Sequence, residues 1–224
     1  MKQDKRLIII GAGGHGKVVS ELAVASGLYS EVTFLDTCYP SRQFHAGLKI
    51  SGDLSTVRSI VSAQNSFFIA IGDNHIRRQL FQSLTQECAD IDLVRSAHSI
   101  VSPTSRIERG TLIMPKVVIN ADAQIGKNVI INTGAIVEHD CKVGDHSHLA
   151  PGSILTGAAS IGCLTTIGAG AVVCPGVRVG DNIILGAGTI ATRDLDTSGY
   201  YSGAPAKWRK HLLFTPSSPE REEV

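Results

Sequence analysis

Residues 119–143 read INADAQIGKNVIINTGAIVEHDCKV, and an aliphatic residue opens each group of six. The same spacing continues on both sides of this stretch. The fourteen positions that share it are Ile107, Ile113, Ile119, Ile125, Ile131, Val137, Val143, Leu149, Leu155, Ile161, Ile167, Val173, Val179 and Leu185. Because Ile, Leu and Val make up about a quarter of the chain, such a run arises by chance with a probability on the order of 10⁻⁸. The segment is therefore a repeat with a period of six.

A period of six fits neither an amphipathic helix, which repeats every 3.6 residues or so, nor a two-faced strand. It fits a coil of short parallel strands, in which three hexads close one triangular turn of about 18 residues. The residue after each aliphatic is often Gly or Asn, which tolerate left-handed or tight backbone, and the fourth is small or β-branched. The repeat spans residues 101–191, and stacked coils bury one another's side chains. We expect residues 192–211 to cap the stack.

Composition and charge limit the classes of function that the chain can have. The chain has 224 residues and a net charge of +1 without a long basic run, which argues against nucleic acid or an anionic membrane as partner. Its five cysteines are widely spaced and lack a C-x-x-C pair, which argues against a disulfide framework or a zinc knuckle. The first apolar run, Leu7–Ile10, is too short for a signal peptide or a membrane span. We predict a cytoplasmic protein that acts on small molecules.

A different pattern covers residues 6–98. The apolar run Leu7–Ile10 leads into the glycine turn GAGGHGK at 11–17 and then into a helical pattern. A second strand, 32–36, ends at Asp36, where dinucleotide-binding units place a carboxylate that holds a ribose. Further along, the pattern predicts a strand at 67–71 and a helix from 74 to about 88.

The glycine turn matches two known motifs in part. Gly11, Gly13 and Gly16 fit G-x-G-x-x-G, which lets a phosphate approach the backbone at a helix N-terminus. The turn also resembles a P-loop, but Val18 replaces the hydroxyl residue that holds Mg²⁺, which excludes nucleoside triphosphate hydrolysis. With about four strands, the domain is one mononucleotide-binding half, so a nucleotide-sugar fits better than NAD. The alternative is a glycine turn that only packs the helix on the sheet.

Three histidines lie within ten residues, in Glu138-His-Asp140 and Asp145-His-Ser-His148. An imidazole is a natural general base near neutral pH when a carboxylate orients its other nitrogen. We predict His139 as the base and Asp140 as its orienter, which requires a corner in the coil or a partner from another subunit. Two other interpretations are open: ordinary polar histidines on the outer face, or a zinc site at a subunit interface.

Eight segments match a known family: Gly11–Val19, Phe34–Asp36, Ile69–Gly72, Asn132–Thr133, Glu138–Cys141, Ser147–His148, Ile184–Gly188 and Gly203–Lys207. Through them the chain resembles the bacterial hexapeptide-repeat sugar acyltransferases of the bacillosamine-pathway N-acetyltransferase and sialic acid O-acetyltransferase type. The resemblance implies a homotrimer of left-handed β-helices with active sites in the clefts between subunits. It also implies acetyl-CoA as co-substrate and no metal.

The same resemblance assigns roles to individual residues. It implies that His139 is the base and that Asp140, where the family usually has Glu, raises its basicity. His148 would contact acetyl-CoA, and Gly157 would present its N–H to the thioester. Ala169 and Ala187 would line the coenzyme channel. The positions that match the nucleotide-sugar site are Gly13, Gly14, His15, Asp36, Thr37 and Gly72.

These patterns predict a half-Rossmann-like α/β domain over residues 1–98, a left-handed parallel β-helix over 99–191, and a cap with a disordered tail over 192–224. We expect an acetyl-CoA-dependent N-acetyltransferase for a 4-amino-4,6-dideoxy sugar linked to a nucleotide, with UDP favoured, that serves glycan biosynthesis. Transfer would be direct, because no Ser or Cys nucleophile is paired with His139, and the N-terminal domain would swing the sugar toward it. The alternatives are O-acetylation of sialic acid or another sugar hydroxyl, and a non-catalytic trimeric nucleotide-binding scaffold.

Overall fold

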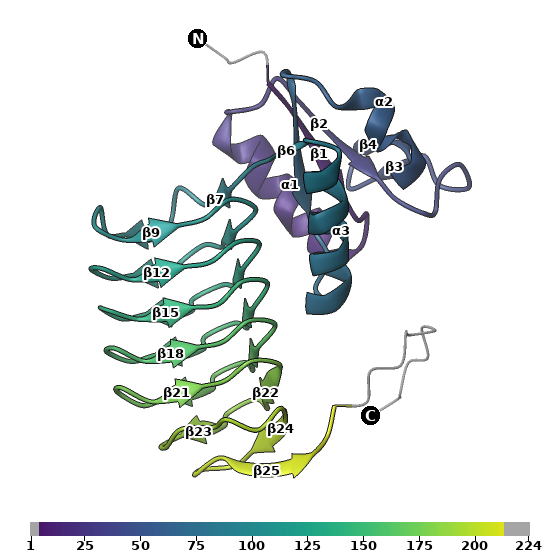
Figure 1. The fold of residues 1–224 in the computed structure, drawn as a ribbon. Coiled ribbons are helices and arrows are strands. Elements are labelled where there is room, and N and C mark those ends of the chain that lie inside the picture. The colour runs from purple at the N-terminus through teal and green to yellow at the C-terminus, as the bar shows by residue number, and fades with distance from the viewer. Residues whose placement is uncertain (1–4, 213–224) are drawn as a thin grey trace.

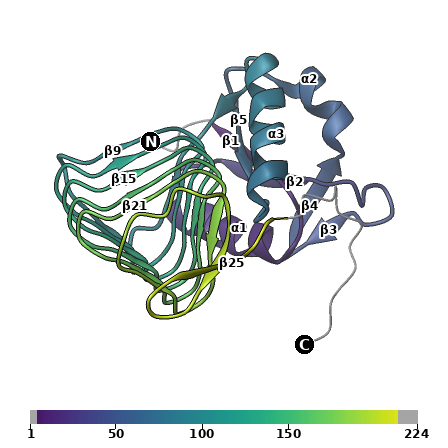
Figure 2. The same ribbon diagram turned by 60° about the horizontal axis from the view of Figure 1, so that its bottom comes forward.

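A computed structural model of the protein describes residues 5–212, and the predicted disordered tail from Thr215 to Val224 lies outside this range. The described chain forms an α/β domain and a tall stack of coils, which lie side by side (Figures 1 and 2). No helix in this part of the chain combines the length and the apolar character needed to cross a membrane.

The α/β domain contains a six-stranded sheet in the order β3-β4-β2-β1-β5-β6, in which every pair is parallel except β3 with β4. Its strands are β1 (Arg6–Ile10), β2 (Glu31–Leu35), β3 (Phe44–His45), β4 (Leu48–Gly52), β5 (Asn65–Ile69) and β6 (Asp90–Ile91). Its helices are α1 (Gly14–Ser26), η1 (Leu54–Thr56), α2 (Val57–Ile60) and α3 (Asn74–Gln86). The sequence predicted about four strands and located three of them, β1, β2 and β5. The five-residue β4 was not located, and β3 and β6 were missed because two residues carry no periodic signal.

Helices cover both faces of this sheet, because successive strand residues point to opposite sides. Leu7 and Ile9 of β1 belong to the same buried cluster as Val19 of α1, whereas Ile8 and Ile10 share a cluster with α3. The central strand is therefore apolar on both sides, as is usual in a parallel sheet. The cluster that contains α1 continues into the coils, so the two parts of the chain share one apolar interior.

Residues from Val94 onward wind into a parallel β-helix with three faces (Figure 1). Face I contains β7 (Val94–Arg95), β10 (Leu112–Ile113), β13 (Ile130–Ile131), β16 (His148–Leu149), β19 (Thr166–Ile167), β22 (Ile183–Leu185), β24 (Gly199–Ser202) and the antiparallel β25 (Lys207–Lys210). Face II contains β8 (Ile100–Val101), β11 (Val118–Ile119), β14 (Ile136–Val137), β17 (Ile154–Leu155), β20 (Val172–Val173) and β23 (Ile190–Ala191). Face III contains β9 (Arg106–Ile107), β12 (Gln124–Ile125), β15 (Lys142–Val143), β18 (Ser160–Ile161) and β21 (Arg178–Val179).

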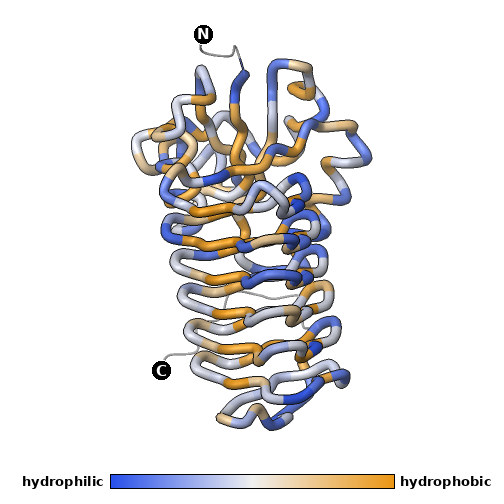
Figure 3. Tube along the Cα trace, turned by 90° about the vertical axis from the view of Figure 1, so that its left-hand side faces the viewer, coloured by the Kyte–Doolittle hydropathy of each residue, from blue (hydrophilic) through white to orange (hydrophobic). Residues whose placement is uncertain are grey.

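Paired residues in successive strands are 18 positions apart, as in Leu112 with Ile130 and Ile130 with His148. Three hexads therefore close one turn, as the period predicted. Thirteen of the fourteen repeat aliphatics are at most 4% exposed, and only Ile107, in the first coil, is partly exposed. Figure 3 shows the apolar residues recurring at the same place in successive coils. Each coil thus buries its neighbour's side chains.

The coil corners differ from the expectation in one respect. The left-handed residues are not the Gly or Asn after each aliphatic but the residues three positions after it, such as Asp140 (φ +60°) and His146 (φ +61°). The glycines serve close packing between coils. A Cβ on Gly144 would lie 2.4 Å from the Gly162 carbonyl carbon, and a Cβ on Gly162 would lie 2.1 Å from Asp181 Oδ1.

The α/β domain packs on face I and on the edge where face III turns into face I, here called edge III/I. Asn74, at the start of α3, donates from Nδ2 to the Leu164 carbonyl (3.1 Å) and to Thr166 Oγ1 (3.0 Å). The outward residues of face I near this domain, Leu112 and Ile130, are 0% and 1% exposed. The edge between faces II and III, edge II/III, lies on the far side of the coils from this domain (Figures 1 and 2).

Both ends of the coil region carry strands outside the hexads. β7 already pairs with β10 before residue 99 is reached, and β24 and β25 follow the last hexad within the region where the sequence predicted a cap. The domain limits at residues 98 and 191 remain predictions.

Candidate active site

His139 occupies the first position of a turn on edge II/III that joins β14 to β15. Asp140 takes the left-handed position of this turn, with φ +60°. The bend lets neighbouring side chains meet, and His139 Nδ1 lies 2.8 Å from Asp140 Oδ2. The imidazole and the carboxylate therefore meet within one chain, at a corner of the coil.

The Asp140 carboxylate sets the chemistry of this imidazole. Its hydrogen bond raises the pKa of His139 above the ordinary value of 6.5; the slight burial opposes this, and the charges of Asp140 and Glu138 add to it. Because the carboxylate accepts from Nδ1–H, it holds the tautomer in which Nε2 has a free lone pair. Nε2 can then act as a proton acceptor.

Gly157 lies at the same corner one coil later and faces the His139 ring. A Cβ on Gly157 would lie 2.7 Å from His139 Nε2 and 2.9 Å from Cε1. The turn itself does not demand glycine, because the equivalent residues are Ala121 two coils earlier and Pro175 one coil later. Gly157 is required only by the imidazole beside it.

The peptide N–H of Gly157 has no hydrogen-bond partner among residues 5–212. On edge III/I the equivalent groups are capped by carboxylates of the next coil: Lys127 N–H donates to Asp145 Oδ1 (2.8 Å) and Cys163 N–H to Asp181 Oδ1 (2.7 Å). An uncapped N–H beside Nε2 can donate to a carbonyl oxygen on which negative charge develops.

The three histidines that are close in sequence lie in three different places. Each hexad turns the chain through a third of a coil, so His139 is on edge II/III, His146 on edge III/I and His148 on face I. His146 Nδ1 lies 2.9 Å from Asn128 Nδ2, and its ring packs edge-on against Phe81. Within the described part of one chain, no three His, Cys, Asp or Glu side chains are grouped as a metal ion would need.

Burial keeps two of these histidines neutral. It lowers the pKa of His146 to about 4. It lowers the pKa of His148 to about 3, and the charge of Arg77 acts in the same direction. Neither imidazole is protonated at pH 7, so each contributes as a neutral donor or acceptor.

The glycine turn leads from β1 into α1 with the geometry of a phosphate-binding turn. Gly11 has φ +106°, and a Cβ on Gly16 would lie 2.0 Å from the Gly11 carbonyl oxygen. Gly13 and Gly14, in contrast, have nothing within 4 Å of a Cβ. Open space therefore lies at the N-terminus of α1, whose free N–H groups attract anions.

Asp36 stands beside this turn. Its Oδ2 accepts from Ala12 N–H (2.6 Å) and its Oδ1 from Cys38 N–H (2.9 Å). Burial acts to raise the pKa of Asp36, but these hydrogen bonds outweigh it, so the pKa lies below the ordinary value. After Thr37 the chain turns back over the glycines, and His45 Nε2 lies 2.9 Å from the Gly13 carbonyl.

A cleft of about 250 Å³ lies between the start of α3 and face I. It brings Gly72 together with His148, and Thr166 and Asn182 also line it. Asn182 Oδ1 is buried without a partner among the described residues, so it can accept from a ligand hydroxyl. Sequence reasoning missed Thr166 and Asn182, because single polar residues in a repeat give no signal.

His15, on the first turn of α1, also has a buried ring nitrogen, Nε2, without a partner in residues 5–212. Burial lowers the pKa of His15 to about 4, and Arg77 contributes to this shift. The ring is therefore neutral at pH 7. His15 and Gly72 belong to the α/β domain, whereas His139 is not among the residues that line the cleft.

Solved structures resemble this arrangement over nearly the whole chain. The acetyltransferase domain of PglB from Neisseria gonorrhoeae FA1090 is 34% identical, with a TM-score of 0.88, over 92% of this chain and 100% of that domain. PerB from Caulobacter crescentus, solved with CoA and GDP-perosamine, is 38% identical, with a TM-score of 0.85, over 91% of this chain and 97% of that one. The chain belongs to the hexapeptide-repeat sugar N-acetyltransferase family.

Two family models match parts of this acetyltransferase, the PglD N-terminal domain over residues 6–84 and the GMPPB C-terminal domain over residues 96–198. The UDP-N-acetylbacillosamine N-acetyltransferase of Bacillus subtilis (strain 168) is 36% identical over 113 residues, 49% of this chain and 51% of that protein. Uncharacterized protein L142 of Acanthamoeba polyphaga mimivirus is 32% identical over 120 residues, 53% of this chain and 23% of that protein. The match therefore spans about half or less of these curated relatives.

The residues that the resemblance assigned to the acetyltransferase site fall into three groups within one chain. These are His139, Asp140 and Gly157 on edge II/III; Ala169 and Ala187 on the edge between faces I and II; and His148 with the nucleotide-sugar positions Gly13, Gly14, His15, Asp36, Thr37 and Gly72 on face I and in the α/β domain. A single chain does not bring the three groups together.

Proposed function

We propose that this enzyme transfers the acetyl group of acetyl-CoA to the amino group of a nucleotide-linked 4-amino-4,6-dideoxy sugar. The observation that carries the proposal is the His139 imidazole, held at Nδ1 by Asp140 and facing Gly157 with Nε2. PerB, solved with CoA and GDP-perosamine, supports the two substrate classes. The open glycine turn at α1 offers a place for the nucleotide diphosphate.

The reaction requires a proton acceptor and a donor for the thioester oxygen. His139 Nε2 takes the proton that the amine loses as its nitrogen bonds to the thioester carbon. Gly157 N–H donates to the oxygen that gains charge, an interaction that is typically worth about 3 kcal/mol. When the carbon–sulfur bond breaks, the imidazolium returns the proton to the departing thiolate. No protein nucleophile is needed, because the amine attacks directly.

A second copy of the chain would complete the site, and we propose the homotrimer that the resemblance implies. His139 belongs to edge II/III, the edge that lies on the far side of the coils from the α/β domain (Figures 1 and 2). Face II carries a column of aliphatic residues that point outward, namely Ile100, Val118, Ile136, Ile154, Val172 and Ile190. Ile100 is 68% exposed, and an apolar face of this kind suits contact with another subunit. The acceptor held by one subunit would then meet His139 of another.

The proposal also includes the nucleotide of the substrate and the cellular compartment of the enzyme. We propose UDP as the favoured nucleotide, supported by the UDP-linked substrate in the name of the Bacillus relative, whereas PerB was solved with a GDP-linked sugar. The cysteine pattern supports the cytoplasm, because all five side chains are free thiols in the structure.

The direct test is an acetyl-CoA assay with UDP- and GDP-linked 4-amino-4,6-dideoxy sugars and with free sialic acid, in which products are identified by mass spectrometry. N-acetylation of a nucleotide-linked amine supports the proposal. Acetylation of sialic acid alone would identify an O-acetyltransferase. Absence of transfer, together with no thermal stabilisation by coenzyme A, would identify a scaffold.

A subunit-mixing assay tests the shared site. His139→Ala should remain folded and lose about 10²- to 10⁴-fold in kcat, the usual contribution of a general base. Asp36→Ala should instead weaken binding of the nucleotide-sugar. If acceptor and base come from different subunits, mixed trimers of the two variants regain turnover that neither has alone. No recovery in verified mixed trimers would refute transfer between subunits.

A further inference from the structure

Arg77, in α3, is a charged residue that the proposed chemistry does not use, yet its side chain is only 1% exposed. Within its own domain, Nη1 donates to the carbonyl oxygens of Ile71 (3.1 Å) and Gly72 (3.0 Å), and Nη2 donates to Asn74 Oδ1 (2.7 Å). Arg77 thus holds the loop after β5 against the start of α3. This loop carries Gly72, which lines the cleft.

The same guanidinium reaches across to the coils. Nε donates to the carbonyl of Asn128 (3.0 Å), and Nη2 donates to those of His146 (2.7 Å) and Ser147 (3.2 Å). Asn128 Nδ2 donates back to the Arg77 carbonyl (3.1 Å). Ser147 immediately precedes His148. The Arg77 side chain therefore joins the loop of residues 70–73, here called the acceptor loop, to the strand that carries His148.

Burial of this charge is not explained by an ion pair. No carboxylate lies within 4.0 Å of Arg77 among the described residues, although every guanidinium nitrogen has an acceptor. Burial lowers the pKa of Arg77 to about 9, and the charge of Asp73 opposes this. A buried charge is costly, and an apolar contact of similar volume is often as stable. The planar fork instead fixes geometry, because its N–H groups can donate to only one arrangement of carbonyl groups.

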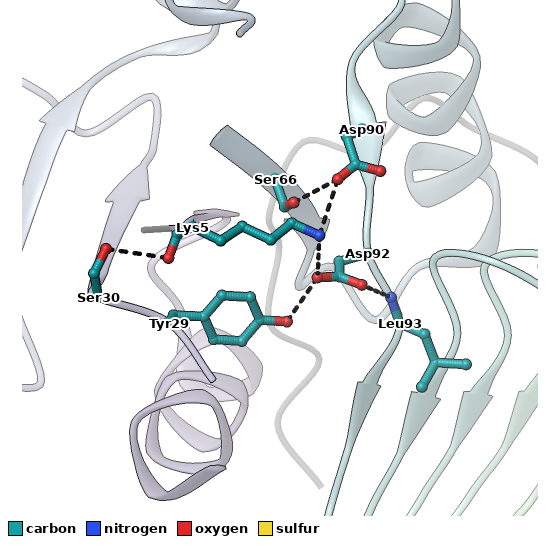
Figure 4. Close-up of polar contacts among 7 residues, drawn as sticks. All are labelled: Lys5, Tyr29, Ser30, Ser66, Asp90, Asp92 and Leu93. Carbon is teal, nitrogen blue, oxygen red and sulfur yellow. Dashed lines mark hydrogen bonds and ion pairs between the residues drawn. The ribbon is translucent and has the colours of Figure 1, made fainter. Parts of the chain in front are cut away.

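A second polar cluster fixes the covalent link between the two parts of the chain (Figure 4). Lys5 Nζ lies 3.1 Å from Asp90 Oδ2 and 3.1 Å from Asp92 Oδ2. Tyr29 OH donates to Asp92 Oδ2 (2.9 Å), and Asp92 Oδ1 accepts from Leu93 N–H (2.9 Å). The linker between β6 and β7 is therefore held where it leaves the α/β domain. With Arg77 as the other attachment, the domain cannot rotate freely about this linker.

We infer that Arg77 is a positioning residue that fixes the acceptor loop relative to the strand bearing His148. The α/β domain is then held in place against the coils and does not swing relative to them. The inference rests on the proposed function. It implies that Arg77 contributes to transfer only when the acceptor is delivered by the α/β domain. A small amine that diffuses to His139 unaided does not need this alignment.

The experiment compares two acceptors, the nucleotide-linked 4-amino sugar and the same sugar as its methyl glycoside. The measured quantity is the ratio of kcat/KM for the linked acceptor to that for the free one. Arg77→Met should lower this ratio about 100-fold, because a misplacement of about 1 Å can cost that much in rate. Arg77→Lys, which keeps three donors, should lower it less. Arg78→Met removes a neighbouring charge whose buried Nε has no hydrogen-bond partner among residues 5–212, and it should leave the ratio unchanged.

The ratio separates positioning from folding, because loss of folded protein lowers both rates equally. If Arg77→Met does not fold, Asn74→Ala weakens the same attachment and should lower the ratio in the same direction. An unchanged ratio in folded Arg77 or Asn74 variants would overturn the inference. Failure of the unmodified enzyme to acetylate either acceptor would instead refute the proposed function.

Discussion

Replacement of Gly157 by Ala tests whether His139 is the base. The added Cβ would lie 2.7 Å from Nε2 and 2.9 Å from Cε1, well inside ordinary van der Waals contact, so the imidazole must move away. The backbone should tolerate the change, because Ala121 occupies the same corner two coils earlier. Gly→Ala substitutions at compatible positions are neutral or stabilising by about 0.4–1 kcal/mol, so the melting temperature should not fall.

The expected effect is on rate. A displacement of about 1 Å in a reacting group costs about 100-fold, which corresponds to about 2.7 kcal/mol in activation free energy. The assay is kcat at saturating acetyl-CoA, with the melting temperature measured on the same sample. Ala121→Gly is the matched control and should keep normal activity. In a His139→Ala background, Gly157→Ala should add little, because both changes act on one group. A folded Gly157→Ala enzyme with undiminished kcat would refute the assignment of His139.

Three further outcomes follow from the electrostatics of the site. Asp140→Asn should lower the pKa of His139, since Asp140 raises it; activity requires the neutral ring, so the rising limb of the pH–kcat profile should move to lower pH while the maximum falls. A limb that stays in place would contradict this. His148→Ala should raise the KM for acetyl-CoA without moving that limb, because the pKa of His148 is about 3 and the ring does not titrate near neutral pH; a shifted limb would make His148 the titrating group. Dialysis against EDTA should leave kcat unchanged, and loss of activity that Zn²⁺ restores would revive the metal interpretation.

The fold could be predicted because it depends on a period. In a coil with three sides of six residues each, positions six apart all point inward, so the aliphatic series from Ile113 to Leu185 predicted both the stack and its buried core. The roles of the residues at the coil corners were harder to predict. Gly162 looked like a residue chosen for left-handed backbone, whereas it makes room for the Asp181 carboxylate of the next coil.

The geometry of the candidate site could be predicted only where its residues are neighbours in sequence. His139 and Asp140 are adjacent, and one turn joins them. The apparent cluster with His146 and His148 was misleading, because seven or nine residues along a triangular coil lead to a different side. Arg77 gave no signal, since most of its partners are backbone carbonyls, which every residue possesses.

The contacts of Arg77 also fix the position of the acceptor loop along the axis of the β-helix. Asn128 and His146 are one full coil apart, and His139 falls between them along the chain. The acceptor loop and the imidazole therefore stand at nearly the same level, within about one strand spacing of 4.8 Å, although on opposite sides of the prism. A rotation about an axis parallel to the coil leaves every level unchanged. Three copies arranged in this way would bring each loop level with a neighbour's imidazole without any shift along the axis.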